Sequence, residues 1–505
     1  MQQTASNAYA DLITRIKDCR LLESCGHLLG WDERTYMPRQ GSRHRGEQMA
    51  LLARMVHEMV TSPAVGDLLS KVESSDVVAD SDSVEAANIR EIRRAHDRAA
   101  KLPRELVEEL ARVTTQAQRV WEDARRDDNF AAFQPWLDKI VQLKRQEAHA
   151  VGYKDVPYDA LLDEYEPGAT TKEITKVFAE LRAELVPLVA AIVNSSKQPK
   201  KGILEREYPV DRQVIFGQAA AAAIGFDFSA GRLDVTTHPF CSTPGPGDVR
   251  LTTRYNARHF NEGFFGILHE AGHGIYEQGL PAEHYGTPCG GAASLGMHES
   301  QSRLWENQVG RSRLFWEHFF PRARQVFIDA LHDVSLDDFM LAINEVRPSF
   351  IRVEADEATY NLHIILRFEL EQALVSGDLA PADVPDAWNE KFQQLLGLTP
   401  PSCRVGCLQD IHWSFAGIGY FPTYTLGNLY AAQLMEQARV DLPELDSGVR
   451  SGDFRALKSW LNEKIHKHGQ RWRAGELCRR ITGRPLTPGP LMNYLRRKYT
   501  QLYGL

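Results

Sequence analysis

The chain is organised around residues 264–276, which read FFGILHEAGHGIY. This stretch contains the pattern H-E-x-x-H, formed by His269, Glu270 and His273. Residues four apart lie on one face of an α-helix, roughly 5–6 Å apart, so both imidazoles can reach one metal ion. Glu270 lies beside them and can act on a water molecule at that metal. The stretch therefore predicts a buried helix that carries a metal site on one face, although so short a pattern also arises by chance.

A catalytic zinc site needs a third protein ligand in addition to two histidines. Glu299 follows His273 closely enough for one loop and the start of a second helix to lie between them. We therefore expect Glu299 to be the third ligand, with His298 beside it as a hydrogen-bonding group. The alternative is that Glu299 only forms an ion pair with Arg303, four residues further along the same helix.

Composition and charge exclude several classes of function. The 505 residues are 43% hydrophobic and 25% charged, which is ordinary for a globular protein, and the net charge is −8. No long basic run is present, so nucleic acid is not an expected partner. No stretch approaches the length of an apolar membrane span, and the polar N-terminus lacks the apolar core of a secretory signal. Seven scattered cysteines, an odd number, indicate free thiols in a reducing compartment, and we expect a cytoplasmic protein.

Helical periodicity dominates on both sides of the central stretch and predicts a mainly α protein. One small β-sheet is expected near the metal helix, with strands near Val235 and over 249–255 joined by a turn at 242–247. Helices are expected over 8–60 with breaks at Gly26 and Gly30, over 66–150 and 171–193, from about 294, and over a segment that carries 351–356 and runs to about Val375. No long linker divides the chain, so residues 1–505 are predicted to form one unit. Within it, residues 1–230 are expected to be helical, residues 231–424 to hold the site, and residues 425–505 to be helical again.

Five further motifs accompany H-E-x-x-H in a fixed order. They read HPF (238–240), DVRLT (248–252), HESQ (298–301), IRVEAD (351–356) and GCLQDIHW (406–413). With these motifs the chain resembles the metallocarboxypeptidases of the carboxypeptidase Taq type, peptidase family M32. Six motifs in this order are far more specific than any one of them, and the resemblance covers essentially the whole chain.

The resemblance implies an elongated helical fold with a deep active-site groove, similar to neurolysin-like and angiotensin-converting-enzyme-like peptidases, the gluzincins. It implies the removal of single amino acids from peptide C-termini, with broad specificity and poor tolerance of proline. The implied cofactor is one divalent metal per chain, Zn²⁺ first and Co²⁺ second. The implied partners are peptides with a free C-terminus and a second copy of the chain in a homodimer.

The resemblance also implies roles that agree with the chemistry of the residues. His269, His273 and Glu299 hold the metal, and Glu270 acts as general base and then as general acid. The oxyanion of the tetrahedral intermediate needs further donors, for which His412, Tyr420 and Tyr424 are candidates. The choice between the two tyrosines stays open.

An exopeptidase must also bind the terminal carboxylate, and a guanidinium does this best because its fork matches the two oxygens. Arg352 is the first candidate, with an ion pair to Asp356 as the alternative, and Arg250 is the second. His238 is a further candidate for substrate contact, although a histidine before proline is often only structural. Four residues are expected to support the site by holding the residues that act in it: Asp248, Asp356, Gln409 and Asp410. Among these, Asp248 and Asp410 are expected to accept hydrogen bonds that orient the metal-binding histidines.

Two other functions remain open at this point. An endo-oligopeptidase or a dipeptidyl carboxypeptidase could use the same zinc core and would differ in where the substrate carboxylate is anchored. A non-enzymatic helical scaffold that binds peptides would have no use for an intact set of His269, Glu270, His273 and Glu299. Metal content discriminates the scaffold from the enzymes.

Overall fold

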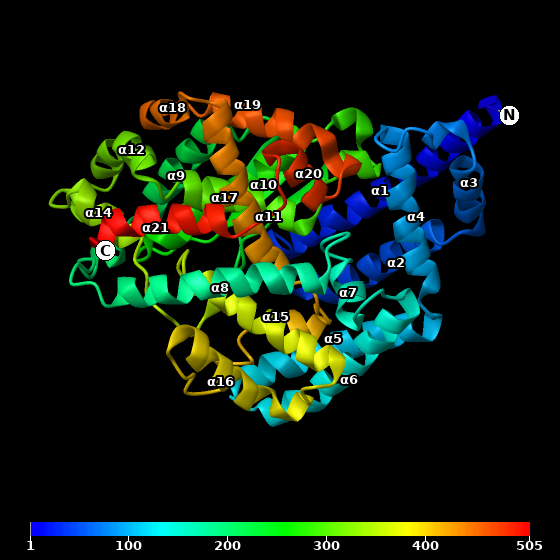
Figure 1. Cartoon of the computed structure of the whole chain (residues 1–505), viewed down its shortest axis with the longest axis horizontal. Coiled ribbons are helices and arrows are strands. Elements are labelled where there is room, and N and C mark those ends of the chain that lie inside the picture. The colour runs from blue at the N-terminus through cyan, green and yellow to red at the C-terminus, as the bar shows by residue number, and fades with distance from the viewer. Residues whose placement is uncertain (1) are drawn as a thin grey trace. The chain divides into compact units, whose positions relative to one another are not determined.

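The computed structural model describes residues 2–505, which form two compact units. The first unit comprises residues 1–100, 200–343 and 434–484, and the second comprises 101–199, 344–433 and 485–505. Helices dominate both units, and all three strands belong to the first (Figure 1). The prediction of a mainly α protein with one small sheet is therefore confirmed.

The first unit contains the sheet and the helix that carries H-E-x-x-H. Its longer elements are α1 (Gln2–Thr35), α2 (Ser42–Val60), α3 (Pro63–Glu73), α4 (Val84–Lys101), α9 (Val210–Ile224), β1 (Gly231–Val235), β2 (Cys241–Gly245), β3 (Asp248–Thr253), α10 (Phe260–Gly279), α11 (Leu295–Arg303), α12 (Arg313–Val326), α14 (Leu336–Ile343), α18 (Leu445–Ser451), α19 (Arg455–Lys464) and α20 (Ala474–Thr482). A π-helical turn, Leu304–Val309, follows α11 directly. The short helix α13 (Ile328–Leu331) follows α12.

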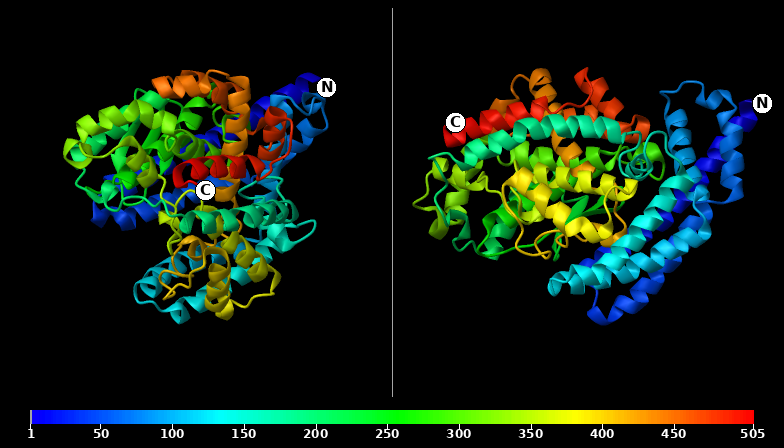
Figure 2. Two further views of the ribbon diagram at one scale, coloured as in Figure 1. Left: turned by 60° about the vertical axis from the view of Figure 1, so that its left-hand side comes forward. Right: turned by 60° about the horizontal axis from the view of Figure 1, so that its bottom comes forward.

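Helix α1 is continuous, and the predicted breaks at Gly26 and Gly30 are wrong (Figure 2). Apolar side chains of α1, α3 and α4, among them Leu12, Leu69 and Ile89, form a common core. Each glycine inside a helix costs only about 1 kcal/mol relative to alanine, so tertiary packing of the rest of the helix outweighs two of them.

The N-terminal half of α10 is buried among aromatic rings. Phe260 and Phe264 stack with ring centroids 5.2 Å apart, and Phe264 lies 5.2 Å from the ring of Trp316 on α12. Phe216 of α9 packs against Phe264 at 5.3 Å. Large aromatic side chains bury much apolar area, so this cluster fixes α10 in the first unit.

The sheet has the strand order β1-β3-β2, with β1 parallel and β2 antiparallel to the central strand β3. The sequence predicted two strands and a turn, and β2 corrects this because the expected turn at 242–247 contains an edge strand. Pro244 is tolerated there because an edge strand needs no ladder bond on its outer side. Val249 and Leu251 of β3 are buried, and Leu251 lies against α10 at Gly274.

The second unit consists of helices and the loops between them, with no strand among its described residues. Its elements are α5 (Arg104–Arg126), α6 (Phe130–Val151), α7 (Pro157–Leu162), α8 (Thr171–Val193), α15 (Tyr360–Ser376), α16 (Val384–Leu396) and α21 (Gly489–Tyr503), and the start of α17 (Pro422–Asp441) also belongs to it. Helix α8 has the bounds that the sequence predicted, and α21 lies along it (Figure 1). Among the described residues, no helix is both long and apolar enough to cross a membrane.

Helices α10 and α11 approach so closely that a glycine is required between them. A Cβ atom on Gly272 would lie 2.6 Å from the carbonyl oxygen of Gln301 and 2.6 Å from Cα of Ser302. Helix α11 begins where the sequence predicted, because the Ser294 side chain accepts a hydrogen bond from the backbone N–H of Met297. The glycine inside H-E-x-x-H therefore sets the distance between the two helices that carry the motif residues.

Replacing Gly272 by alanine tests this contact. The new methyl group would meet backbone atoms, which cannot rotate away, so we expect Gly272→Ala to destabilise the protein by about 1–3 kcal/mol. Gly26→Ala is the matched control, since no atom lies within 4 Å of the added Cβ and alanine favours a helix. Thermal unfolding measures both variants. Equal melting temperatures for the two would contradict the close contact.

Candidate functional site

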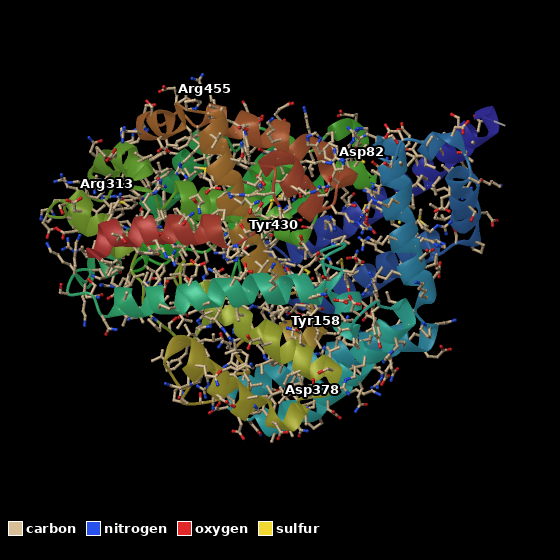
Figure 3. The ribbon with its side chains drawn as sticks, in the orientation of Figure 1. Asp82, Tyr158, Arg313, Asp378, Tyr430 and Arg455 are labelled. Carbon is tan, nitrogen blue, oxygen red and sulfur yellow. The ribbon has the colours of Figure 1, made fainter. Side chains whose placement is uncertain are left out.

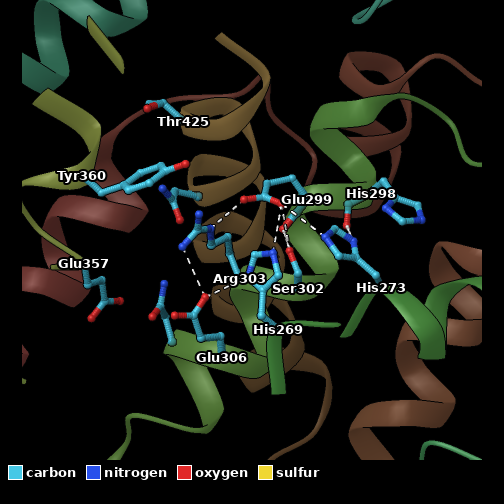
Figure 4. Close-up of polar contacts among 12 residues, drawn as sticks. His269, His273, His298, Glu299, Ser302, Arg303, Glu306, Glu357, Tyr360 and Thr425 are labelled. Carbon is cyan, nitrogen blue, oxygen red and sulfur yellow. Dashed lines mark hydrogen bonds and ion pairs between the residues drawn. The ribbon is translucent and has the colours of Figure 1, made fainter. Parts of the chain in front are cut away.

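The fold brings together the three residues that the sequence predicted as metal ligands. One nitrogen from each of His269 and His273 and one oxygen of Glu299 lie within 4.8 Å of one another. Glu299 Oε2 is 3.6 Å from His269 Nε2 and 3.4 Å from His273 Nε2 (Figure 4). Two imidazole nitrogens and a carboxylate oxygen that converge in this way are the donor set of a catalytic zinc site.

The other nitrogen of each imidazole is held by an acceptor. His269 Nδ1 donates to Glu306 Oε2 at 2.9 Å, and His273 Nδ1 donates to the carbonyl oxygen of His298 at 3.1 Å. Both acceptors place the ring proton on Nδ1, which leaves the lone pair of Nε2 directed toward Glu299. The sequence predicted that Asp248 and Asp410 orient the metal-binding histidines. Glu306 instead orients His269, so that prediction is corrected.

Glu299 is both an ion-pair partner and a candidate ligand, so the two alternatives from the sequence do not exclude each other. Its Oε1 accepts from Arg303 Nε at 2.7 Å, while Oε2 faces the histidines and accepts from Ser302 Oγ at 3.1 Å (Figure 4). Burial alone would raise the pKa of Glu299, but Arg303 and the two histidines hold it well below its usual range. The carboxylate is therefore charged, as a ligand must be.

Glu270 is 6% exposed and lies beside this cluster on α10. Burial raises the pKa of its carboxyl group to about 7. Burial also lowers the pKa of His273 to about 3, so this imidazole is neutral at physiological pH. A carboxyl group that titrates near neutral pH suits a residue that accepts a proton and later returns it.

His298 packs behind His273. The two rings stack with centroids 4.4 Å apart, and His298 Nε2 bonds Glu277 Oε1 at 2.8 Å. This stacking supports the position of His273, and the bond to Glu277 occupies Nε2 of His298.

Arg250, Asp248 and His238 do not join the cluster on α10. Arg250 alternates along β3 with Val249 and Leu251, which face α10, so its side chain lies on the opposite face of the sheet. There it donates to both oxygens of Asp248, at 2.7 and 2.8 Å, and its guanidinium lies 4.3 Å from the ring centroid of Trp31. His238 is exposed in the bend between β1 and β2. Arg250 thus lies on the face of β3 that points away from α10, and its role as the second candidate for the carboxylate anchor stays a prediction.

Arg352 lies in the second unit, in a short 3₁₀ turn (Arg352–Glu354) and not on the helix that the sequence predicted. Its Nε and Nη2 donate to Asp410 Oδ1 at 3.0 and 2.8 Å, and its Nη1 donates to the Tyr360 hydroxyl at 2.9 Å. The side chain of Asp356 instead accepts backbone N–H groups of Arg347, Ala358 and Thr359. The Asp356 carboxylate thus orders the segment before α15, and it corrects the alternative of an Arg352–Asp356 ion pair.

Asp410 links Arg352 to a second buried arginine. Arg367, which is fully buried, donates from Nε to Asp410 Oδ2 at 2.6 Å. Burial opposes the charge on Asp410, but the two guanidinium groups hold its pKa well below its usual range. Gln409 completes the arrangement, since its Oε1 accepts the backbone N–H of Arg352 at 2.8 Å. We call these four residues, Arg352, Arg367, Gln409 and Asp410, the Arg352 cluster.

His412 and the two tyrosines predicted to stabilise an oxyanion come together in the same unit. His412 Nε2 and the Tyr424 hydroxyl are 3.1 Å apart, and the rings of His412 and Tyr420 have centroids 5.3 Å apart. Burial lowers the pKa of His412 to about 3, so the imidazole is neutral. Both tyrosines are partly exposed. The arrangement places two partly exposed tyrosine hydroxyl groups beside a buried imidazole, in the segment that leads into α17.

A buried carboxylate that the sequence analysis did not single out holds this loop. Glu371 of α15 accepts hydrogen bonds from the hydroxyl of Tyr158 at 2.6 Å, from Trp413 Nε1 at 3.0 Å and from the backbone N–H of Gly419 at 3.0 Å (Tyr158 is labelled in Figure 3). Gly419 has φ of +93°, and a Cβ there would lie 2.8 Å from the backbone of Leu161. Glu371 therefore fixes the loop at the residue after His412 and at the residue before Tyr420.

Comparisons with known proteins agree with this geometry. The model of one family, described as carboxypeptidase Taq (M32) metallopeptidase, matches residues 11–499. The chain belongs to the M32 family. It is 48% identical over 510 aligned positions to thermostable carboxypeptidase 1 of Thermus thermophilus, covering 99% of this chain and 100% of that one. It is 38% identical to carboxypeptidase 1 of Bacillus subtilis, with 99% of both chains covered.

Solved structures show that the M32 fold is shared. The crystal structure of an M32 carboxypeptidase from Deinococcus radiodurans R1 matches with a TM-score of 0.95 and 40% identity, over 99% of this chain and 100% of that one. A Pyrococcus furiosus carboxypeptidase matches with a TM-score of 0.94 and 36% identity, over 97% and 99% of the two chains. The protein is thus a hydrolase of the metallocarboxypeptidase class that depends on a divalent metal.

Three residues of the M32 site escaped the sequence analysis: Glu306, Arg367 and Glu371. Glu306 could have been found, because Glu299, Arg303 and Glu306 are spaced four and three residues apart and so share a helix face. Arg367 and Glu371 carry no such signal, because their partners are 43 and 48 residues away in sequence.

The bond between Glu306 and His269 predicts a measurable loss of metal affinity. Glu306→Gln keeps the shape but removes the charge that favours the Nδ1–H form of His269, so we expect affinity for Zn²⁺ to fall about 10–100-fold. Glu317→Gln, which changes a partly exposed carboxylate on α12, is the matched control and should leave affinity unchanged. Competition with a fluorescent chelator measures both. Unchanged affinity in Glu306→Gln would refute the role of Glu306.

Proposed function

We propose that this M32 protein removes single amino acids from the free C-termini of peptides, with broad specificity, using one divalent metal held by His269, His273 and Glu299. The observation that supports the ligand set most directly is the convergence of Nε2 of both histidines on Glu299 Oε2. Nitrogen and oxygen donors of this kind suit Zn²⁺ and also Co²⁺. We place Zn²⁺ first.

A divalent metal at this position would polarise the scissile carbonyl group and lower the pKa of bound water toward ~7. Glu270 accepts the proton of the attacking water, since its carboxyl group is buried beside the histidines and titrates near neutral pH. The same carboxyl group then donates the proton to the departing amine. The neutral imidazole of His273 and the charged Glu299 need no change of protonation during this exchange.

His412, Tyr420 and Tyr424 are proposed to stabilise the oxyanion. Two features support this role: the two phenol groups are partly exposed, and the imidazole beside them is neutral. Neutral donors that are fixed before reaction stabilise a developing negative charge without reorganisation. The bond between His412 and Tyr424 orients one of the hydroxyl groups.

Arg352 is proposed to bind the terminal carboxylate of the substrate. Its bonds to Asp410 and Tyr360 fix the guanidinium, and a guanidinium that is fixed in advance loses little entropy when it binds a carboxylate. Asp410 binds Arg352 directly, and Arg367 binds the other oxygen of Asp410. His238 and His298 retain at most secondary roles in substrate binding, since one is exposed in a bend and the other is bonded to Glu277.

We also propose that the protein works as a homodimer in the cytoplasm. The family resemblance supports the homodimer. The seven cysteines, none of which forms a disulfide, fit a reducing compartment.

A peptide ladder tests the proposed reaction. A synthetic peptide incubated with the Zn²⁺-loaded protein should lose one C-terminal residue at a time, and a chelator should abolish the loss. Glu270→Gln should bind metal normally but lose activity by about 10³-fold or more, because proton transfer typically contributes 10²–10⁴-fold. Mass spectrometry of the products gives the order of release. Release of dipeptides, internal cleavage, or near-normal turnover by Glu270→Gln would each refute the proposal.

Arg352 is tested with two substitutions. Arg352→Ala should raise KM for peptides with a free C-terminus about 30- to 100-fold, corresponding to the roughly 2–3 kcal/mol of a charged hydrogen-bonded pair. Arg352→Lys keeps the charge beside Asp410 but not the fork, so it separates loss of recognition from loss of folding. Arg250→Ala is the matched control and should leave KM unchanged. If Arg352→Ala cleaves free and C-terminally amidated peptides as the parent does, the carboxylate is bound elsewhere.

A further inference from the structure

Two cysteines of the second unit, Cys403 and Cys407, lie four residues apart and line the same cavity. The backbone between them is a tight turn, in which the N–H groups of Gly406 and Leu408 both donate to the carbonyl oxygen of Cys403, at 3.1 and 2.8 Å. The turn therefore brings both cysteine side chains to the same cavity.

The pair is accessible from one side. Cys403 is partly exposed, Cys407 is 5% exposed, and both line an open cavity of about 270 Å³ together with Asp128, Asn389 and Ser402. The backbone N–H of Arg404 donates to Asp128 Oδ1 at 2.7 Å, which anchors the turn at the edge of the cavity. A small molecule that enters the cavity meets Cys403 first.

The two thiols differ in reactivity. The hydrogen bond from Cys407 lowers the pKa of Cys403 to about 7, although burial and the carboxylates of Asp128 and Asp386 oppose this. The same bond and burial raise the pKa of Cys407 well above its ordinary value. A thiol with a pKa near the ambient pH is the best attacking group in thiol–disulfide exchange, and a neighbouring thiol then resolves the product.

We propose that Cys403 and Cys407 form a reversible dithiol–disulfide pair that small-molecule disulfides oxidise and that acts on the Arg352 cluster. The Cys403 thiolate attacks one sulfur of a disulfide RS–SR, and RS⁻ leaves with the electron pair of the broken bond. Cys407 then loses its proton and attacks the Cys403 sulfur, which releases the second RS⁻. In sum, two protein thiols and RS–SR give one protein disulfide and two RSH.

The turn is connected to Arg352 through Gln409. The side-chain amide of Gln409 donates to the carbonyl oxygens of Val405 and Gly406, at 3.0 and 3.2 Å, which lie between the two cysteines. Its oxygen accepts the backbone N–H of Arg352. Asp410, the next residue, binds the guanidinium. Formation of a disulfide shortens the sulfur–sulfur distance to about 2 Å, so the turn contracts and these bonds shift.

Oxidation is therefore expected to displace the guanidinium of Arg352. Because a misplacement of about 1 Å can cost up to about 10²-fold, we expect kcat/KM to fall on the order of tenfold, mostly through KM. This kinetic consequence rests on the proposed function of Arg352. Formation of the disulfide and movement of the turn do not.

The first test needs no activity. The Zn²⁺-loaded protein is incubated with oxidised glutathione, the remaining thiols are alkylated, and peptides are analysed by mass spectrometry. We expect a Cys403–Cys407 disulfide, and in Cys407→Ser a glutathione adduct trapped on Cys403. Amide hydrogen exchange should change over residues 405–412. Modification confined to other cysteines, such as the exposed Cys25, or unchanged exchange in the disulfide form, would overturn the proposal.

The second test is kinetic and uses Cys403→Ser as the matched control, because this variant keeps the other six cysteines. Oxidised glutathione should raise KM of the parent and a phosphine reductant should restore it, while Cys403→Ser should respond to neither. An equal response of the parent and of Cys403→Ser, or a disulfide that leaves KM unchanged, would refute the link to Arg352. If the reduced parent protein shows no carboxypeptidase activity, this result refutes the proposed function and leaves the proposed disulfide untouched.

Discussion

The candidate metal site depends on the close contact between α10 and α11. Gly272 has no side chain, and this allows the backbone of α11 to come near enough for Glu299 to face both histidines. The same contact buries charged carboxylates, which is costly unless they are paired. Arg303 meets this requirement, since it bonds Glu299 at 2.7 Å and Glu306 at 3.2 Å. Gly272 thus allows the close packing of the two helices, and Arg303 balances the negative charge that this packing buries.

Elements with strong local signals could be predicted from the sequence. Helix α8 and the start of α11 follow from a capping side chain and a regular apolar period. Strand β2 could not be predicted, because its proline and its glycine are typical of turns and only pairing with β3 makes it a strand. Helix α1 passes through two glycines for a similar reason: its packing against α3 and α4 outweighs local preference.

The residues of the candidate site also fall into those that local sequence predicts and those that it does not. His269, Glu270, His273 and Glu299 were found because they lie close together in sequence, where helical spacing decides which side chains meet. Arg367 and Glu371 depend on contacts between distant segments, which spacing does not reveal. Arg250 lies apart from the metal ligands, because alternation along β3 turns its side chain away from α10.

The π-helical turn Leu304–Val309 has a consequence for how this site could change over time. A π turn holds one residue more than an α turn, so it rotates everything that follows by about 100° about the helix axis. Glu306 lies inside this turn and contacts His269 from there. Deletion of a single residue after Arg303 would restore a regular helix and swing the carboxylate away. Deletion of one codon would thus leave His269 without the acceptor that orients it, while the surrounding fold is kept.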